Sequence, residues 1–132
     1  MDLATPIKSA FKVKSFTDLY AWREAHALVL SIYKTAQLFP PEEKFGLKSQ
    51  ICRAAVSISS NIAEGFSRKT IKEKRQFYTT ALASLTEIQN QLLIARDLHF
   101  VNNETFTRVA EQSVKTGKLI NGIIKSAQGH EK

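Results

Sequence analysis

Cysteine, proline and glycine are scarce in this sequence. Its 132 residues include one cysteine, Cys52, three prolines and five glycines. A single cysteine excludes an intramolecular disulfide and a zinc site built from several cysteines, and so little proline and glycine excludes collagen-like or loop-dominated folds. No apolar run approaches the roughly 18 residues that span a bilayer, and the N-terminus lacks a signal-peptide core. We therefore expect one cytoplasmic domain without a membrane anchor.

Residues typical of catalysis or metal binding are equally sparse. The histidines His26, His99 and His130 have no metal-ligand spacing, and the chain has neither a glycine-rich phosphate loop nor a Glu-x-x-His pair. Arg53 beside Cys52 could lower the pKa of the thiol, which leaves a redox bundle as one hypothesis, although a lone helical cysteine usually packs as a small hydrophobe. We expect a non-enzymatic protein with no metal and no cofactor.

Basic residues clearly outnumber acidic ones. The chain has 19 lysines and arginines against 12 aspartates and glutamates, a net charge of +7, and its pI is about 9.7. A domain this basic suits a polyanionic partner, above all nucleic acid. The alternative is that the basic residues only keep the protein soluble. The positions of the charges in the structure have to distinguish the two explanations.

Apolar residues recur at helical spacing in four segments. The first segment begins near Ser15 or Thr17 and ends at Phe39, with the apolar face Leu19, Trp22, His26, Val29, Tyr33 and Ala36. The second begins within 41–47 and ends near Gly65, with the line Leu47, Ile51, Ala54, Ile58 and Ile62. The third follows Thr70 and ends at 98–101, with Phe77, Ala81, Leu85, Ile88, Leu92 and Ala95. The fourth covers 103–127, with Phe106, Val109, Ser113, Thr116, Ile120, Ile123 and Ile124.

Local signals support these boundaries. Ser15 with Asp18, and Thr70 with Glu73, have capping-box spacing, and Gly65 is suited to a terminal turn. Short connections between long helices favour antiparallel neighbours. The sequence therefore predicts an all-α fold, an antiparallel up-down-up-down four-helix bundle over residues 16–127, with a flexible basic arm at 1–15 and a disordered tail at 128–132.

The densest basic cluster lies between the second and third predicted helices. Residues 68–75 contain five basic side chains and one acidic one. On a continuous helix Arg68, Lys72 and Arg75 would share a face, whereas a turn between the two helices would place the cluster at one end of the bundle. The free N–H groups at the start of the third helix also attract anions. We expect phosphate contacts first from Arg68, Lys69, Lys72 and Arg75, with an ordinary solvated helix start as the alternative.

A second basic strip follows the fourth helix opposite its apolar stripe. Lys115, Lys118 and Lys125 lie on it with Arg108, while Glu104 and Glu111 reduce its charge, so solvation explains the strip as well as binding does. No aromatic stacking platform interleaves with either basic group in the sequence. Binding is therefore expected to rely on phosphates, with weak sequence specificity.

Two further lines of residues are short of charge. The third helix carries Thr80, Ser84, Glu87, Gln91 and Ile94 on what the pattern predicts to be its outer face. A nearly uncharged surface favours contact with another subunit, and an ordinary neutral surface is the alternative. The second helix carries Gln50, Arg53, Ser57, Asn61 and Glu64 along one side. If this line is partly buried, Glu64 needs a basic partner, either Arg53 or a basic residue from another helix. The alternative is that Asn61 and Glu64 belong to the exposed last turns of the helix.

The second segment resembles a known family. The residues that carry the resemblance are Phe45-Gly46-Leu47, Gln50, Arg53-Ala54-Ala55-Val56-Ser57-Ile58 and the motif Ser60-Asn61-Ile62-Ala63-Glu64-Gly65. They are similar to four-helix-bundle proteins encoded in intervening sequences of bacterial 23S ribosomal RNA genes. Two positions depart from the pattern: Ser59 replaces a frequent proline, and Cys52 a frequent basic residue.

The resemblance implies a ring-like homopentamer without catalysis. Relatives with this fold serve as accessory proteins of diversity-generating retroelements, which bind nucleic acid and a reverse transcriptase. Our interpretation is a homo-oligomer that binds structured nucleic acid, RNA or DNA, with RNA as the first expectation. The alternative is a protein-interaction adaptor, such as a reverse-transcriptase accessory subunit.

Overall fold

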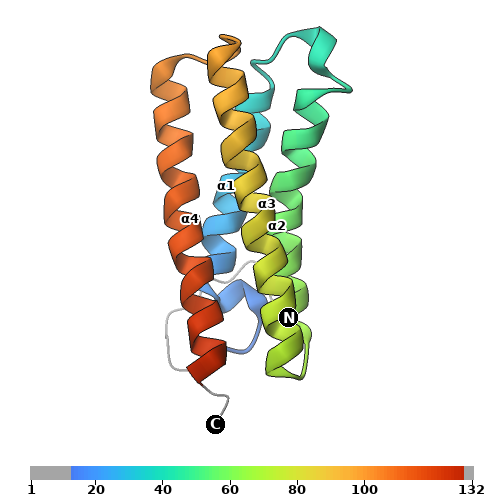
Figure 1. The fold of residues 1–132 in the computed structure, drawn as a ribbon, viewed down its shortest axis with the longest axis vertical. Helices are drawn as coiled ribbons and strands as arrows, with labels where there is room; N and C mark the ends of the chain where they lie inside the picture. Colours follow the sequence, from blue (N-terminus) through green and yellow to red (C-terminus); the bar gives the residue numbers. More distant parts are fainter. Residues whose placement is uncertain (1–12, 130–132) are drawn as a thin grey trace.

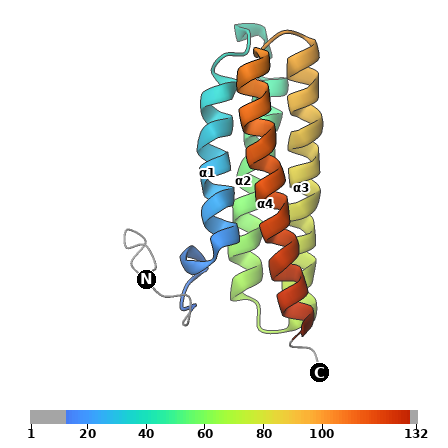
Figure 2. The ribbon, with the colours of Figure 1, turned by 90° about the vertical axis from the view of Figure 1, so that its left-hand side faces the viewer.

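The computed structural model of the chain describes residues 13–129. Its long helices are α1 (Tyr20–Ala36), α2 (Leu47–Ser67), α3 (Ile71–Asp97) and α4 (Asn103–Gly129), and its short 3-10 helices are η1 (Phe16–Asp18) and η2 (Pro41–Glu43). The prediction of four helices is confirmed, and residues 13–129 contain no strand. In Figure 1 the chain rises through α1, descends through α2, rises through α3 and descends through α4. Figure 2 shows the helices side by side along one long axis.

Three of the four predicted apolar stripes form the core. Their fully or nearly fully buried members are Ile51, Ala54, Ile58 and Ile62 of α2, Ala81, Leu85, Ile88, Leu92 and Ala95 of α3, and Val109, Ser113, Thr116 and Ile120 of α4. The end members of the α2 and α4 stripes, Leu47, Phe106, Ile123 and Ile124, pack partly buried against this core. None of the helices between residues 13 and 129 has an apolar stretch that matches the thickness of a bilayer.

The predicted apolar face of α1 is wrong except for Ala36, which is buried as predicted. The buried residues of this helix are Ala21, Ala25, Leu28, Ile32, Thr35 and Ala36. Tyr33 keeps 47% of its surface exposed, His26 is exposed as well, and Trp22 and Val29 lie at the margin of the core. Both faces of α1 are apolar, so periodicity alone could not choose between them. The alanine-rich face is inside because small side chains let neighbouring helices approach closely.

Both predicted capping pairs form, but one caps a different element. Thr70 accepts a hydrogen bond from the backbone N–H of Glu73 at 3.1 Å, as predicted. The Ser15–Asp18 capping box forms the N-terminal cap of η1 and not of α1, because the extended residue Leu19 separates the two helices. At the other end, α4 continues to Gly129, two residues past its predicted end. Residues 1–12 of the expected arm and 130–132 of the expected tail, His130 included, lie outside the described residues.

Gly65 does not supply a terminal turn. α2 continues through it to Ser67, and its φ is not positive. A Cβ atom at this position would lie 2.7 Å from Cε1 of Tyr78 and 2.9 Å from Cβ of Phe77. Glycine is therefore required by the close approach of α3, and this contact sets how tightly the α2–α3 hairpin closes.

Candidate nucleic-acid interface

The chain changes direction inside the predicted basic cluster. Arg68 is the C-cap of α2 and has an extended backbone, with φ −72° and ψ 150°, and α3 begins only at Ile71. A turn therefore joins the two helices here, and the shared face of Arg68, Lys72 and Arg75 that a continuous helix would give does not form. Arg68 ends one helix, while the other two residues lie on the first turns of the next.

The charge of Arg68 is largely satisfied within the protein. Its guanidinium lies 3.0 Å from a carboxylate oxygen of Glu64 and 4.0 Å from one of Glu73. It also lies over the ring of Phe77, 4.7 Å from the centroid. Two carboxylates and an aromatic face hold this side chain in place, so a phosphate would have to compete with both anions.

Lys74 has a structural role in the same turn. Its Nζ donates to the carbonyl oxygens of Phe66 at 2.6 Å and Gly65 at 3.4 Å, which are among the last carbonyls of α2. The ends of helices leave such carbonyls without intrahelical partners, and a lysine can satisfy them. Partial burial lowers the pKa of Lys74 below its ordinary value. This lysine joins the end of α2 to the start of α3.

The remaining basic residues of the cluster differ in exposure. Lys69 and Lys72 are exposed, while Arg75 is half-buried on α3. No ion pair joins Lys69 or Lys72 to a carboxylate within residues 13–129. Of the four residues predicted to contact phosphate here, these two lysines are the ones that extend into solvent with their charges uncompensated.

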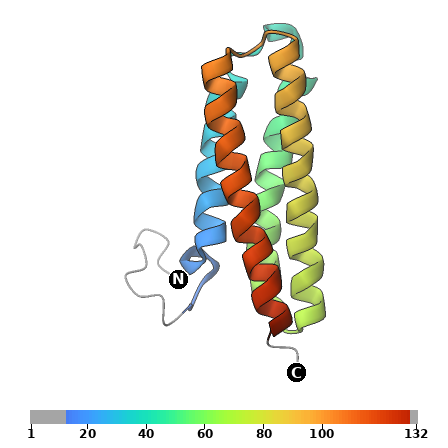
Figure 3. The same ribbon diagram turned by 60° about the vertical axis from the view of Figure 1, so that its left-hand side comes forward.

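The three predicted lysines of α4 are not equivalent. Lys115 lies 3.4 Å from a carboxylate oxygen of Glu24 on α1, and Lys118 is exposed near the middle of the helix. Lys125 is exposed one turn before the end of α4. Figures 1 and 3 show the end of α4 and the α2–α3 turn at the same end of the bundle. We call Lys69, Lys72 and Lys125 the basic end.

The start of α3 is a weaker anion site than its free N–H groups predict. The Thr70 hydroxyl caps the N–H of Glu73, and the Glu73 carboxylate accepts from the same hydroxyl at 2.9 Å. The helix terminus therefore already has an anionic side chain of its own within the first turn.

Two aromatic rings lie beside charges of the basic run, although the run itself contains no aromatic residue. The Phe77 ring lies beneath Arg68, and the Phe66 ring lies 5.4 Å from Nζ of Lys74. The sequence did contain a signal for this, because Phe66 and Phe77 directly flank the basic run 68–75. A third aromatic side chain, Phe16, joins this end from η1, and only the fold brings it there.

The predicted subunit contact on α3 is not an outer face throughout. Ser84 and Gln91 are buried inside the protomer, and the Ser84 hydroxyl lies 2.9 Å from that of Ser57 on α2. The other three members, Thr80, Glu87 and Ile94, are exposed. The line is short of charge in part because it follows the seam between two helices.

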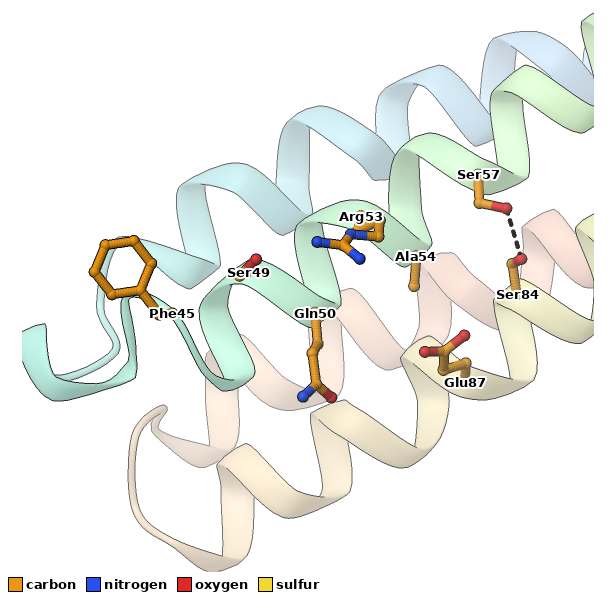
Figure 4. A pocket seen from close by; sticks show the side chains of 8 residues that line it. All are labelled: Phe45, Ser49, Gln50, Arg53, Ala54, Ser57, Ser84 and Glu87. Atoms are coloured by element: carbon orange, nitrogen blue, oxygen red, sulfur yellow. Dashed lines mark hydrogen bonds between the residues drawn. The ribbon is translucent and has the colours of Figure 1, made fainter.

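Above this seam, α2 and α3 form an open groove of about 450 Å³. Figure 4 shows Arg53 and Gln50 on α2, Glu87 on α3, and Phe45 at one end of the groove. The Phe45 ring is 89% exposed, which is unusual for a large apolar side chain. The motif Phe45-Gly46-Leu47 was visible in the sequence, but only the structure shows that this ring is exposed instead of packed.

The polar line of α2 ends in an exposed turn, as in the alternative that the sequence left open for Glu64. Glu64 pairs with Arg68, one turn ahead on the chain, and not with Arg53. Asn61 donates through its Nδ2 to the carbonyl oxygen of Ser57 at 2.8 Å and to the Ser57 hydroxyl at 3.1 Å. Only Ser57 and Asn61 of this line are half-buried, while Gln50, Arg53 and Glu64 are exposed. The Asn61 bonds are local to α2, and the partner from another helix is Ser84, beside Ser57.

Cys52 has the character of a packed thiol. Burial raises its pKa, and this effect is larger than the opposing effect of the nearby Lys48, whereas the sequence had suggested that Arg53 would lower it. A raised pKa reduces the thiolate fraction and hence the reactivity of the group. Within residues 13–129, no three histidine, cysteine, aspartate or glutamate side chains gather in an arrangement that could hold a metal ion.

Comparison with known proteins identifies the family. The family model of the 23S rRNA-intervening sequence protein matches residues 17–122. The chain belongs to this family. The motif-based resemblance is thereby confirmed for the intervening-sequence family. A solved structure from Bacteroides thetaiotaomicron, described as a protein with unknown function from the S23 ribosomal protein family, matches with a TM-score of 0.74. It shares 20% identity and covers 80% of this chain and 98% of its own, so it shows a common fold. No curated protein matches.

Proposed function

We propose that this member of the 23S rRNA-intervening sequence protein family is a non-enzymatic, cytoplasmic protein that binds structured RNA through phosphate contacts. The observation that carries the proposal is the basic end, where Lys69, Lys72 and Lys125 are exposed. Each such contact releases counterions from the nucleic acid, which gives affinity without sequence specificity. The family name, which refers to 23S rRNA, agrees with RNA as the polyanion.

The phosphate-binding residues that the structure favours differ from those that the sequence predicts. Arg68 is engaged by Glu64 and Glu73, so we assign it to positioning the turn. Lys115 is partly neutralised by Glu24 and contributes less than Lys125. The net charge of +7 favours a polyanion in any arrangement, and a ring of several copies, as in the homopentamer that the resemblance implies, would multiply the field at its basic ends.

The decisive experiment is RNA binding measured over a range of salt concentrations. The double variant Lys69→Ala/Lys72→Ala removes two exposed cations from the basic end. If both lysines contact phosphate, the slope of log affinity against log salt should fall by about 1.4 to 1.8, because each lost contact changes it by about 0.7 to 0.9.

The matched control is Lys34→Ala/Lys44→Ala. Both of these lysines are exposed and lie toward the opposite end of the bundle, at the end of α1 and after η2. The control changes the net charge by the same amount. Equal losses of RNA affinity in the two double variants would show that binding depends only on the total charge and not on the basic end. An RNA affinity of the unmodified protein that does not change with salt would refute the proposal.

One observation favours a second candidate function, a protein-interaction adaptor. The exposed Phe45 ring stands at the end of a groove that contains both Arg53 and Glu87. Aromatic anchors beside polar groups are typical of protein interfaces. We propose that this groove makes the contact between subunits of the oligomer, or with a polymerase such as a reverse transcriptase if the chain acts as an accessory subunit.

A further inference from the structure

A second depression lies beside the basic end. It has a volume of about 660 Å³, within the range of roughly 300–1,000 Å³ typical of small-molecule sites. Its lining comes from η1, α2 and α3 and consists of Phe16, Ser60, Asn61, Ala63, Glu64, Ser67 and Phe77. Four of these residues belong to the Ser60–Gly65 motif, and Ser67 follows the motif two residues later. We call this depression the motif pocket.

The two aromatic walls of the motif pocket are held by neighbours outside it. The Phe16 ring contacts the Trp22 ring edge-on, with centroids 5.2 Å apart, and Trp22 stacks on His26 at 4.8 Å. The Phe77 ring is covered by the guanidinium of Arg68. Flat apolar walls that are already in position are suited to a planar aromatic ligand, and bases of unpaired RNA stack on such side chains.

The polar groups offered by the motif pocket are mainly acceptors. The Nδ2 group of Asn61 is used by Ser57, so Oδ1 is the atom left for a ligand. One carboxylate oxygen of Glu64 accepts from Arg68, and the other has only a 3.4 Å contact with the Ser67 hydroxyl. Asn61 and Glu64 are three residues apart on a helix, so their side chains are neighbours.

We infer that the motif pocket binds an unpaired guanine base of RNA. Guanine presents an imino N–H and an adjacent amino group on its Watson–Crick edge, which match a carboxylate and an amide oxygen. Adenine and cytosine present only the amino group there, and uracil only one imino N–H. The exposed Lys69 follows Ser67 and Arg68 in the chain and can contact the flanking phosphate. The inference rests on the proposed RNA binding and adds the class of base recognised.

Trp22 provides a direct readout, because it is the only tryptophan in the chain and contacts a wall of the motif pocket. Its fluorescence is titrated with each of the four nucleoside monophosphates in turn. Guanosine monophosphate should bind about tenfold more tightly than the others, as expected for one two-point base contact. A short oligouridylate with one central guanosine should bind more tightly than plain oligouridylate by a similar factor.

The variant Glu64→Gln separates base recognition from charge. It removes an anion beside the basic end, so electrostatics alone predicts tighter binding of every RNA. Recognition of guanine by the carboxylate instead predicts that the preference for guanosine falls to about twofold or less. Glu73→Gln is the matched control, because Glu73 also lies near Arg68 and is similarly exposed but does not line the motif pocket. It should keep the preference.

The outcomes distinguish this inference from the proposed function. Salt-dependent RNA binding with no preference among the four nucleotides overturns the inference and leaves the proposed function standing. Guanosine monophosphate binding that depends on Glu64, without binding of longer RNA, supports recognition of guanine by the motif pocket. The same result refutes RNA as the source of that guanine, together with the proposed function. If the motif pocket is covered by a second copy of the chain, no nucleotide will change Trp22 fluorescence, and the inference fails.

Discussion

Replacing Gly65 by alanine tests the close contact between α2 and α3 at this residue. In an exposed helix this change stabilises a protein by about 1 kcal/mol, because alanine is the better helix former. Here the new Cβ atom would lie within 3.0 Å of three atoms of Phe77 and Tyr78. One of them is the Cβ of Phe77, which cannot move unless the α3 backbone moves too. Tyr78 is only 4% exposed and has little room to rotate.

The expected magnitude follows from these two opposing effects. Overpacking a dense core costs about 1 to 3 kcal/mol, and the contacts at Gly65 place the cost near the upper value. After subtracting the gain in helix propensity, we expect Gly65→Ala to lower the free energy of unfolding by about 2 kcal/mol. For a chain of this size, the loss corresponds to a fall in Tm of about 8 °C.

The measurement is urea unfolding of Gly65→Ala beside Gly122→Ala, at one protein concentration so that assembly does not differ. Gly122 is also in a helix, and a Cβ atom there would meet no atom within 4 Å. The control should therefore gain about 0.5 to 1 kcal/mol. If both substitutions stabilise the protein equally, the close approach of α3 to Gly65 is not real.

Two further predictions concern other parts of the bundle. Burial raises the pKa of the Tyr78 phenol above its ordinary value of 10.0, so the unfolded chain loses this proton first and stability should decline as the pH rises above about 10. The free energy of unfolding of Tyr78→Phe, measured by urea unfolding below and above about pH 10, should fall less than that of the unmodified protein. Equal falls in the two proteins would contradict the assignment of this pH dependence to Tyr78. Phe45→Ser should leave the free energy of unfolding of the protomer within about 0.5 kcal/mol, since the side chain is exposed. It should also lower the assembled mass in light scattering, whereas an unchanged mass would exclude Phe45 from the subunit contact.

The helical framework was predictable because its causes are local. The stripes of α2, α3 and α4 follow from apolar residues at steps of three and four, and the start of α3 follows from Thr70 and Glu73, which are three residues apart. The stripe of α1 failed because that helix is apolar on more than one side. Which face is buried depends on how closely the neighbouring helices approach, and the spacing of apolar residues within one helix does not determine that distance.

The candidate site was predictable only in part. The basic run 68–75 was evident, but which of its charges remain available was not, since Glu64 belongs to the preceding helix and Glu73 to the following one. Sequence reasoning placed Arg68 in the first group of phosphate ligands, together with Lys69, Lys72 and Arg75. The geometry instead leaves Lys69 and Lys72 exposed and engages Arg68 between two carboxylates.

The amino-acid sequence by itself determined that four amphipathic helices form, where most of them begin, and that the surface has an excess of positive charge. These properties depend on residues within a turn or two of one another, or on composition alone. Only the tertiary structure decided that the alanine-rich face of α1 is buried and that α3 approaches Gly65 too closely for a side chain. It also decided that Phe16 lies beside the Ser60–Gly65 motif. Each of these depends on distances between helices, and such distances arise only when segments far apart in the chain pack together.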